Sequence, residues 1–193
     1  MHKRRLAAAL SLLITPVIVH AQQASHDSMP HAGTWAAEVF LGNAVSGASV
    51  LRFHSPKLAL LFGAEFSLSH VGESDGIPQA LSGTTTNVAA RLGLRSYRGS
   101  STNRLRPVVG GGLRNSYSKT PNVQLWSAGA YGELGAMYFL TPHISLGGTG
   151  ELQASYGERK QTIFFASGTS QSTKQDVVTA SASLMRVMLA VYF

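Results

Sequence analysis

The chain has 193 residues, of which 44% are hydrophobic and 13% are charged, and it contains no cysteine. This length suits one domain, or at most two small ones. The low charge content and the ample apolar residues exclude a disordered chain, and the lack of cysteine excludes disulfide scaffolds, thiol nucleophiles and a lipidated-cysteine anchor. The formal net charge of +7 suggests an acidic partner, but three of the 16 basic residues lie in the first five positions. Without them 13 basic residues face 9 acidic ones, a net charge of +4.

Residues 1–21 have the three parts of a secretory signal peptide. A basic start precedes an apolar run, and small residues around Ala21 predict cleavage after that residue. A membrane anchor is the alternative, but the apolar run is shorter than the ~20 residues of a spanning helix, and Pro16 interrupts it. Residues 22–33 are polar and are predicted to form a flexible segment. The domain proper is therefore expected to span residues 34–193.

After residue 33 the hydrophobic pattern alternates with a period of two, which is typical of strands with two different faces. In the last segment, for example, Val187, Leu189, Val191 and Phe193 share one face. Turn signals divide the chain into eight such segments, at residues 34–42, 47–54, 58–70, 84–98, 105–117, 125–140, 143–157 and 177–193. Most of them exceed the usual soluble strand of about 5–6 residues.

Charged residues within these segments separate by parity. Nine of them fall on the polar face of their own segment: Glu38, Arg52, Glu65, Arg91, Arg95, Arg114, Glu133, Glu151 and Arg186. A small closed barrel in a bilayer requires this pattern, with lipid outside, polar side chains inside and no unpaired sheet edge. A soluble sandwich or a lipocalin-like barrel is the alternative, but lysines would be scattered over its wet face, whereas here they lie at segment ends or in loops. The predicted fold is all-β, an eight-stranded antiparallel up-and-down transmembrane β-barrel.

The connections between the segments differ in length. With the N-terminus in the periplasm, the outer connections are residues 43–46, 71–83, 118–124 and 158–176, and the inner ones are residues 55–57, 99–104 and 141–142. Longer outer loops and short inner turns are common in bacterial outer-membrane barrels. Aromatic residues are expected to face lipid at both rims, with Trp35, Phe53, Tyr138 and Phe193 at the inner rim and Tyr117, Trp126 and Tyr156 at the outer rim.

The lumen of an eight-stranded barrel is just wide enough for side chains to fill. Most of the nine charged residues lie at a similar height in their segments, and strands that carry glutamate border strands that carry arginine. Because either sign is costly to bury unpaired, these residues are predicted to form ion pairs that plug the lumen. A gated conduction path is the alternative.

The last segment ends in alternate apolar residues and a carboxy-terminal Phe193, which resembles the C-terminal signature of outer-membrane barrels. Together with the signal peptide and the eight segments, the chain resembles the small barrels of the outer-membrane protein A/X type. The resemblance implies that Phe193, Val191 and Leu189 form the signal recognised by the barrel-assembly machinery. It also implies delivery by periplasmic chaperones and contact with outer-membrane lipid and lipopolysaccharide.

Enzymatic residues are harder to find. Lipid A deacylases of this barrel size use a histidine, a nearby serine and an acid, for which His143, Ser145 and Glu151 are the best candidates. His143, however, follows a short inner turn, whereas those enzymes act at the outer leaflet, so a turn histidine is the favoured interpretation. Residues 110–112 are three glycines but open no helix, so they lack the context of a phosphate loop. No catalytic, cofactor-binding or metal-binding residues are predicted.

The predicted function is a non-enzymatic structural or surface-interaction role, in adhesion or envelope integrity. Deacylase-like modification of lipid A and a narrow channel for small solutes are the alternatives. Nucleic-acid binding is not expected, because the basic residues are dispersed rather than gathered on one face. The outer connections, above all residues 158–176, are where a host or surface ligand would make contact.

Deletion of Phe193 tests the expected assembly signal. We expect the shortened chain to fail to reach the outer membrane, because its last strand loses the terminal aromatic residue. Membrane fractionation, with unheated and boiled samples compared on a gel, measures this, and Phe193→Tyr is the control that keeps an aromatic ring. Normal assembly of the shortened chain would contradict the assignment.

Overall fold

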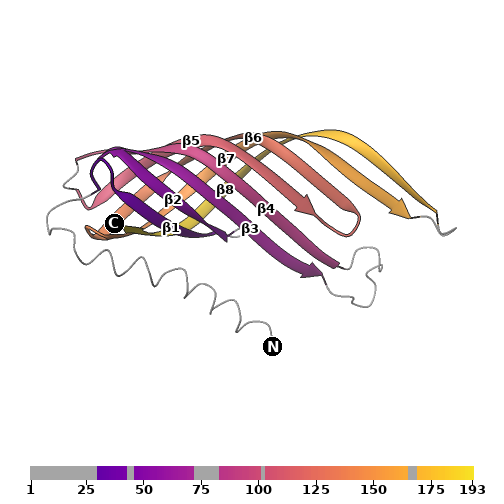
Figure 1. Cartoon of the computed structure of the whole chain (residues 1–193), viewed down its shortest axis with the longest axis horizontal. Helices are drawn as coiled ribbons and strands as arrows, with labels where there is room; N and C mark the ends of the chain where they lie inside the picture. Colours follow the sequence, from indigo (N-terminus) through magenta and orange to yellow (C-terminus); the bar gives the residue numbers. More distant parts are fainter. Residues whose placement is uncertain (1–29, 43–45, 72–82, 101–102, 165–168) are drawn as a thin grey trace, which may run out of the picture.

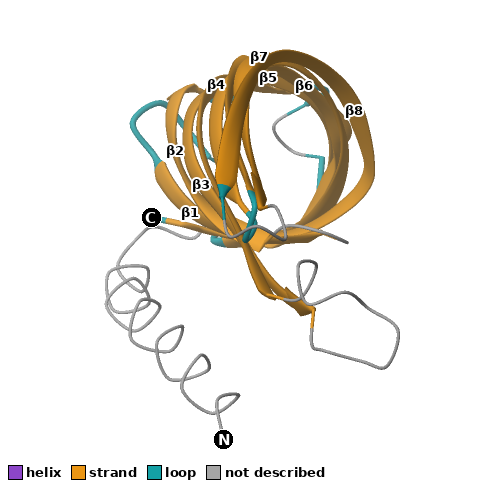
Figure 2. Cartoon of the chain, turned by 90° about the vertical axis from the view of Figure 1, so that its right-hand side faces the viewer, coloured by secondary structure: helices purple, strands orange, loops and turns teal. Residues whose placement is uncertain are grey.

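Eight antiparallel strands close into one barrel in the computed structural model (Figure 1). Each strand pairs with its neighbours in the sequence, and the last strand closes the ring by pairing with the first. The strands are β1 Trp35–Gly42, β2 Ser46–Ser55, β3 Leu58–Val71, β4 Gly83–Tyr97, β5 Leu105–Lys119, β6 Val123–Thr141, β7 Ile144–Phe164 and β8 Ser170–Tyr192. The predicted eight-stranded up-and-down barrel is therefore confirmed, and Figure 2 shows the ring seen from one end.

The structure describes residues 30–42, 46–71, 83–100, 103–164 and 169–193. The predicted signal peptide, most of the predicted flexible segment and most of the predicted outer connection 71–83 lie outside these ranges. Within the described ranges, no helix is long and apolar enough to cross a membrane.

The last two strands are longer than the sequence pattern predicts. β7 and β8 stay paired as far as Phe164 opposite Ser170, so most of the predicted loop 158–176 is a strand hairpin. Polar residues occupy both faces of this extension, and Lys174 lies 3.0 Å from Glu158 across the pair. The alternation of apolar and polar residues is absent from this extension, so the sequence pattern predicts a loop. That prediction is wrong because the backbone pairing continues without the alternation.

The barrel has two unlike ends. The terminal end carries the start of β1 and the end of β8, and the distal end carries the β7–β8 hairpin (Figure 1). β1 and β2 have 8 and 10 residues, whereas β7 and β8 have 21 and 23. The wall is therefore low over β1 and β2 and high over β6 to β8.

The outer surface is apolar along most of the barrel. Leu113, Leu134 and Leu152 are 66%, 67% and 68% exposed, and many other large apolar side chains are at least 37% exposed. Of the aromatic residues expected to face outward, Trp35, Tyr138 and Phe193 are exposed near the terminal end. Tyr117, Trp126 and Tyr156 are exposed toward the distal end. A surface with this much apolar area is not typical of a soluble protein.

The inward face changes character along the barrel. Its middle is charged, but at the terminal end it consists of a layer of buried rings, here called the aromatic floor: Phe53, Tyr97, Phe139 and Tyr192, each at most 1% exposed. The ring centroids of Phe53 and Tyr97 are 5.2 Å apart, and those of Phe139 and Tyr192 are 5.3 Å apart. The prediction that Phe53 faces lipid is therefore wrong, because aromatic side chains occupy much of the lumen at this end.

All three consecutive glycines of β5 have close neighbours, and for Gly111 the Tyr131 carbonyl oxygen would lie 2.9 Å from an added Cβ. A Cβ on Gly110 would collide with the Glu133 carboxylate and with the Leu94 carbonyl oxygen at 2.9 Å. A Cβ on Gly112 would collide with the Leu92 carbonyl oxygen of the neighbouring strand. These residues therefore give room to a charged side chain and allow close approach of the strands.

Substitution of Gly110 tests this packing. Gly110→Val is expected to lower the free energy of unfolding by about 1–3 kcal/mol or more, because overpacking displaces Glu133. Urea unfolding in detergent measures the change. Gly132→Val is the matched control, because Gly132 faces outward and the nearest atom to its added Cβ is 3.9 Å away. Equal destabilisation by both variants would contradict a specific role for Gly110.

Candidate functional site

Eight of the nine predicted lumen charges meet in the middle of the barrel. We call this set the charge network: Glu38 (β1), Glu65 (β3), Arg91 and Arg95 (β4), Arg114 (β5), Glu133 (β6), Glu151 (β7) and Arg186 (β8). All except Arg114 are almost completely buried. Alternation along each strand points every second side chain inward, which is how residues far apart in the sequence converge.

The upper group of the network, nearer the distal end, contains three arginines and two glutamates. Glu65 contacts all three arginines, with Arg114 Nη2 at 2.7 Å, Arg186 Nη1 at 3.0 Å and Arg91 Nη1 at 3.3 Å. Glu151 lies 2.5 Å from Arg91 Nη2 and 2.9 Å from Arg186 Nη1. The formal charge of this group is +1.

The lower group, nearer the aromatic floor, contains one arginine and two glutamates. Arg95 donates through Nε and Nη2 to the two oxygens of Glu133, at 2.6 Å and 3.1 Å. Its Nη1 lies 2.5 Å from Glu38 Oε2. The formal charge of this group is −1, and a 3.8 Å contact from Arg91 to Glu133 joins it to the upper group. The charge network is therefore neutral as a whole.

Like charges sit directly opposite each other on neighbouring strands at two points. Arg91 pairs with Arg114 in the β4–β5 register, and Glu133 pairs with Glu151 in the β6–β7 register. Such pairs are destabilising by themselves. Here Glu65 bridges the two arginines, and Arg91 reaches both glutamates. Each like-charged pair is therefore neutralised by side chains from elsewhere in the ring.

The partners differ from those that strand order suggests. Most of the contacts cross the lumen, as between Arg91 on β4 and Glu151 on β7, or skip a strand, as between Arg114 on β5 and Glu65 on β3. Only the contacts of Arg91 with Glu65 and of Arg186 with Glu151 join neighbouring strands. Long arginine side chains in a narrow lumen reach across it, so adjacency in the wall does not determine pairing.

Arg52 is the exception among the nine residues. It is exposed on the outer face of β2, and its guanidinium carbon lies 5.3 Å from the ring centre of Trp35. Its neighbours Leu51 and Phe53 are the inward residues, at 0% and 1% exposure. The prediction that Arg52 belongs to the lumen is wrong, because at this end of β2 the apolar residues point inward and the charged residue points outward.

Arg106 on β5 was missed as a lumen residue. It is fully buried, donates from Nη2 to the Pro56 carbonyl at 2.6 Å and lies over the ring of Tyr97 at 5.3 Å. It has the same parity as Arg114, eight residues further along β5. That parity was the available signal for Arg106.

The residues considered for acid–base chemistry do not meet as a catalytic set. His143 Nδ1 lies 3.2 Å from the Tyr192 carbonyl oxygen, and the Ser145 hydroxyl lies 2.8 Å from the Tyr192 hydroxyl. Both residues thus bind Tyr192 at the terminal end, while Glu151 belongs to the upper group of the charge network.

The three residues of the predicted assembly signal lie where the ring closes. Leu189 pairs with Val39 and Val191 pairs with Ala37 across the β1–β8 junction. Phe193 and Trp35 exchange two backbone hydrogen bonds of 2.9 Å. Leu189 and Phe193 are 41% and 42% exposed on the outer face.

Comparisons with known proteins agree with the architecture. No protein-family model and no curated protein matches the chain. Among solved structures, the outer membrane protein OprG from Pseudomonas aeruginosa is 16% identical with a TM-score of 0.57, covering 86% of this chain and 99% of that chain. A major outer membrane protein from Thermus thermophilus is 18% identical with a TM-score of 0.56, covering 84% and 100%. The N-terminal barrel domain of Pseudomonas aeruginosa OprF is 14% identical with a TM-score of 0.52, covering 86% and 100%.

The chain has the fold of the small outer-membrane β-barrels. At these identities the likeness concerns the fold alone.

Substitution of Arg95 tests how far the lower group depends on it. Arg95→Met is expected to lower the free energy of unfolding by about 3–5 kcal/mol, because Glu38 and Glu133 lose their main partner while buried. Urea unfolding in detergent or vesicles measures the loss. Arg52→Met, on the outer face, is the matched control and is expected to change stability by less than about 1 kcal/mol.

A second substitution separates charge from packing. Adding Glu38→Gln to Arg95→Met removes one uncompensated carboxylate, so the double variant is expected to recover part of the lost stability. If Arg95→Met is no more harmful than Arg52→Met, the charge network does not stabilise the barrel.

Proposed function

We propose that this chain is a bacterial outer-membrane protein, a barrel with a closed lumen and a structural or surface-interaction role. The apolar outer surface supports insertion in a bilayer, because exposed leucines along the barrel would be costly in water. The exposed aromatic residues near both ends are suited to the two membrane interfaces. The signal-like leader of the sequence agrees with export.

The terminal end is assigned to the periplasm and the distal end to the outside. Short turns join the strands at Pro56–Lys57 and Pro142–His143 at the terminal end, and the long β7–β8 hairpin rises at the distal end. Short periplasmic turns and long outer extensions are the rule for barrels of this kind.

The observation that carries the closed-lumen proposal is the filling of the lumen at two successive levels. The charge network occupies the middle, and the aromatic floor lies between it and the terminal end. Paired buried charges and packed rings leave no route for hydrated solutes. This supports a structural plug rather than a gated path.

The β7–β8 hairpin is the part proposed to make surface contacts. Beyond the outward aromatic Tyr156 it carries exposed charged residues of both signs, among them Arg159, Lys160 and Lys174. Such basic residues are suited to lipopolysaccharide phosphates or to acidic groups on another surface.

A non-enzymatic role is proposed because His143 and Ser145 are both bound to Tyr192 and not arranged around a substrate site.

Planar-bilayer recording tests the closed lumen. The purified, refolded chain is expected to give no reproducible conductance steps, because both filled levels block the path. An open porin inserted under the same conditions is the positive control, and a shift between unheated and boiled gel samples shows that the chain is folded. Reproducible steps from the folded chain would overturn the proposal of a plug.

Mass spectrometry of lipid A tests the non-enzymatic role. Cells with and without the gene are expected to have the same acyl pattern. An altered pattern that His143→Ala abolishes would overturn this part of the proposal.

A further inference from the structure

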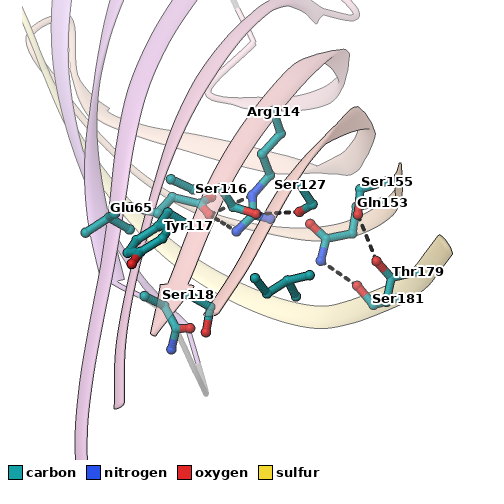
Figure 3. A pocket seen from close by; sticks show the side chains of 14 residues that line it. Glu65, Arg114, Ser116, Tyr117, Ser118, Ser127, Gln153, Ser155, Thr179 and Ser181 are labelled. Atoms are coloured by element: carbon teal, nitrogen blue, oxygen red, sulfur yellow. Dashed lines mark hydrogen bonds and ion pairs between the residues drawn. The ribbon is translucent and has the colours of Figure 1, made fainter. Parts of the chain in front are cut away.

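A cavity lies on the distal side of the upper group of the charge network. Its volume is about 300 Å³. Figure 3 shows Arg114, Ser116 and Ser127 on one side of it and Gln153, Ser155 and Thr179 on the other. These residues lie nearer the distal end of their strands than the charge network does, apart from Arg114, which belongs to both. We call this cavity the cup. Its volume is at the lower limit of the ~300–1,000 Å³ usual for small-molecule sites.

The bottom of the cup is positively charged. The upper group has three arginines against two glutamates, and its excess charge lies in a narrow space where screening by water is weak. Among its arginines, Arg114 has the most exposed side chain, at 18%, against 2% for Arg91 and 7% for Arg186. Arg114 is therefore the cation that a molecule in the cup would meet.

The guanidinium of Arg114 has one edge engaged and one edge turned away from its partner. Both of its hydrogen bonds to Glu65 Oε2 use the Nε and Nη2 edge, at 3.0 Å and 2.7 Å. The geometry of the group places Nη1 on the other edge. An incoming anion can accept hydrogen bonds there without breaking the ion pair with Glu65.

The wall of the cup carries hydroxyl and amide groups that are paired with each other. Ser116 and Ser127 are joined at 2.8 Å between β5 and β6, and Ser155 and Thr179 at 2.9 Å between β7 and β8. Gln153 donates from its amide nitrogen to Ser181 at 2.5 Å. In each hydroxyl pair one O–H is used, which leaves one donor and several lone pairs for a ligand. The wall is therefore suited to a molecule that itself carries several hydroxyl groups.

The chemistry of the cup does not suit a metal cation. Glu65 is the acidic residue of its lining, and its side chain is only 1% exposed beneath the arginines, so a metal cation finds no accessible carboxylate.

We propose that the cup binds an anionic monosaccharide, a sugar that carries one carboxylate or phosphate group. The anionic group contacts the Nη1 edge of Arg114, and the sugar hydroxyls contact the paired Ser116 and Ser127 on one side and Ser155 and Thr179 on the other. The site rests on the proposed function in one respect only. The proposed orientation of the barrel determines from which side of the membrane the ligand enters. A blocked lumen agrees with it, because a molecule that enters from the distal end is held rather than passed on.

Isothermal titration of the full refolded chain in detergent micelles tests the site. The probes are glucuronate, glucose 6-phosphate, glucose and inorganic phosphate. We expect saturable binding of glucuronate or glucose 6-phosphate. Glucose is expected to bind at least about tenfold more weakly, because it cannot make the charge-assisted hydrogen bonds to Arg114. Inorganic phosphate is also expected to bind at least about tenfold more weakly, because it does not reach the hydroxyl pairs. Which of the two anionic sugars binds identifies the carboxylate or the phosphate as the preferred group.

Variants locate the binding. Arg114→Gln is expected to weaken binding of the anionic sugar by about tenfold or more, whereas Arg52→Gln, an arginine on the outer face, leaves it unchanged. If Arg114→Gln does not fold, Ser155→Leu combined with Thr179→Leu fills the cup from its more exposed wall and is expected to abolish binding. The gel shift between unheated and boiled samples shows that each variant keeps the barrel.

Several outcomes would overturn the proposal. They are absence of binding for both anionic sugars, equal binding of glucose, equal binding of inorganic phosphate, and binding that survives filling of the cup. None of them bears on the closed lumen, which conductance tests separately.

Discussion

Each of the four glutamates buried inside this barrel is met by at least one arginine, and that constraint governs the strand register. Arg91 faces Arg114, and Glu133 faces Glu151, so neither pair is tolerable without the other. A slip of β4 by one residue would turn both of its lumen arginines outward. Glu38 and Glu133 would lose their arginine partners, and Glu151 would lose one of its two. Ion pairs of this kind contribute less to net stability than to the choice of one arrangement. We infer that the charge network selects the register of the ring.

Small residues provide the space that the arginines need. Tyr131 lies under Arg91, with the guanidinium carbon 4.0 Å from the ring centre, and its hydroxyl occupies the space that a Cβ on Gly93 would fill. In the same way Glu133, the partner of Arg95, occupies the space beside Gly110. Each arginine of β4 is therefore held by a large residue of β6, and each of these large residues occupies space that a side chain at a nearby glycine would need.

The sequence allowed the fold and most of the lumen to be predicted, because alternation is a local property of each strand. Turn signals separate the eight segments, the short connections favour their antiparallel order, and parity gives the inward position of eight charges. The predicted faces of Arg52 and Phe53 are wrong because the charge was used to set the parity, and at this end of β2 the inward residues are apolar. The ion-pair partners depend on the stagger between strands and on the reach of arginine across the lumen, neither of which a single sequence reveals. The β7–β8 extension was missed because its two faces are equally polar.

An irregularity in β8 explains how this one strand lines two different parts of the lumen, the charge network and the cup. Between Thr149 opposite Arg186 and Glu151 opposite Ser183, two steps on β7 correspond to three on β8, so β8 contains a bulge. On the terminal side of the bulge the even-numbered residues Arg186, Met188 and Tyr192 are the buried ones. On the distal side the odd-numbered Thr179 and Ser181 bond to the inward Ser155 and Gln153. Unbroken alternation would instead place Ala180 and Ala182 in the lumen and these polar residues in lipid. The extra residue therefore joins a charged plug to a hydroxyl-lined cup within one strand.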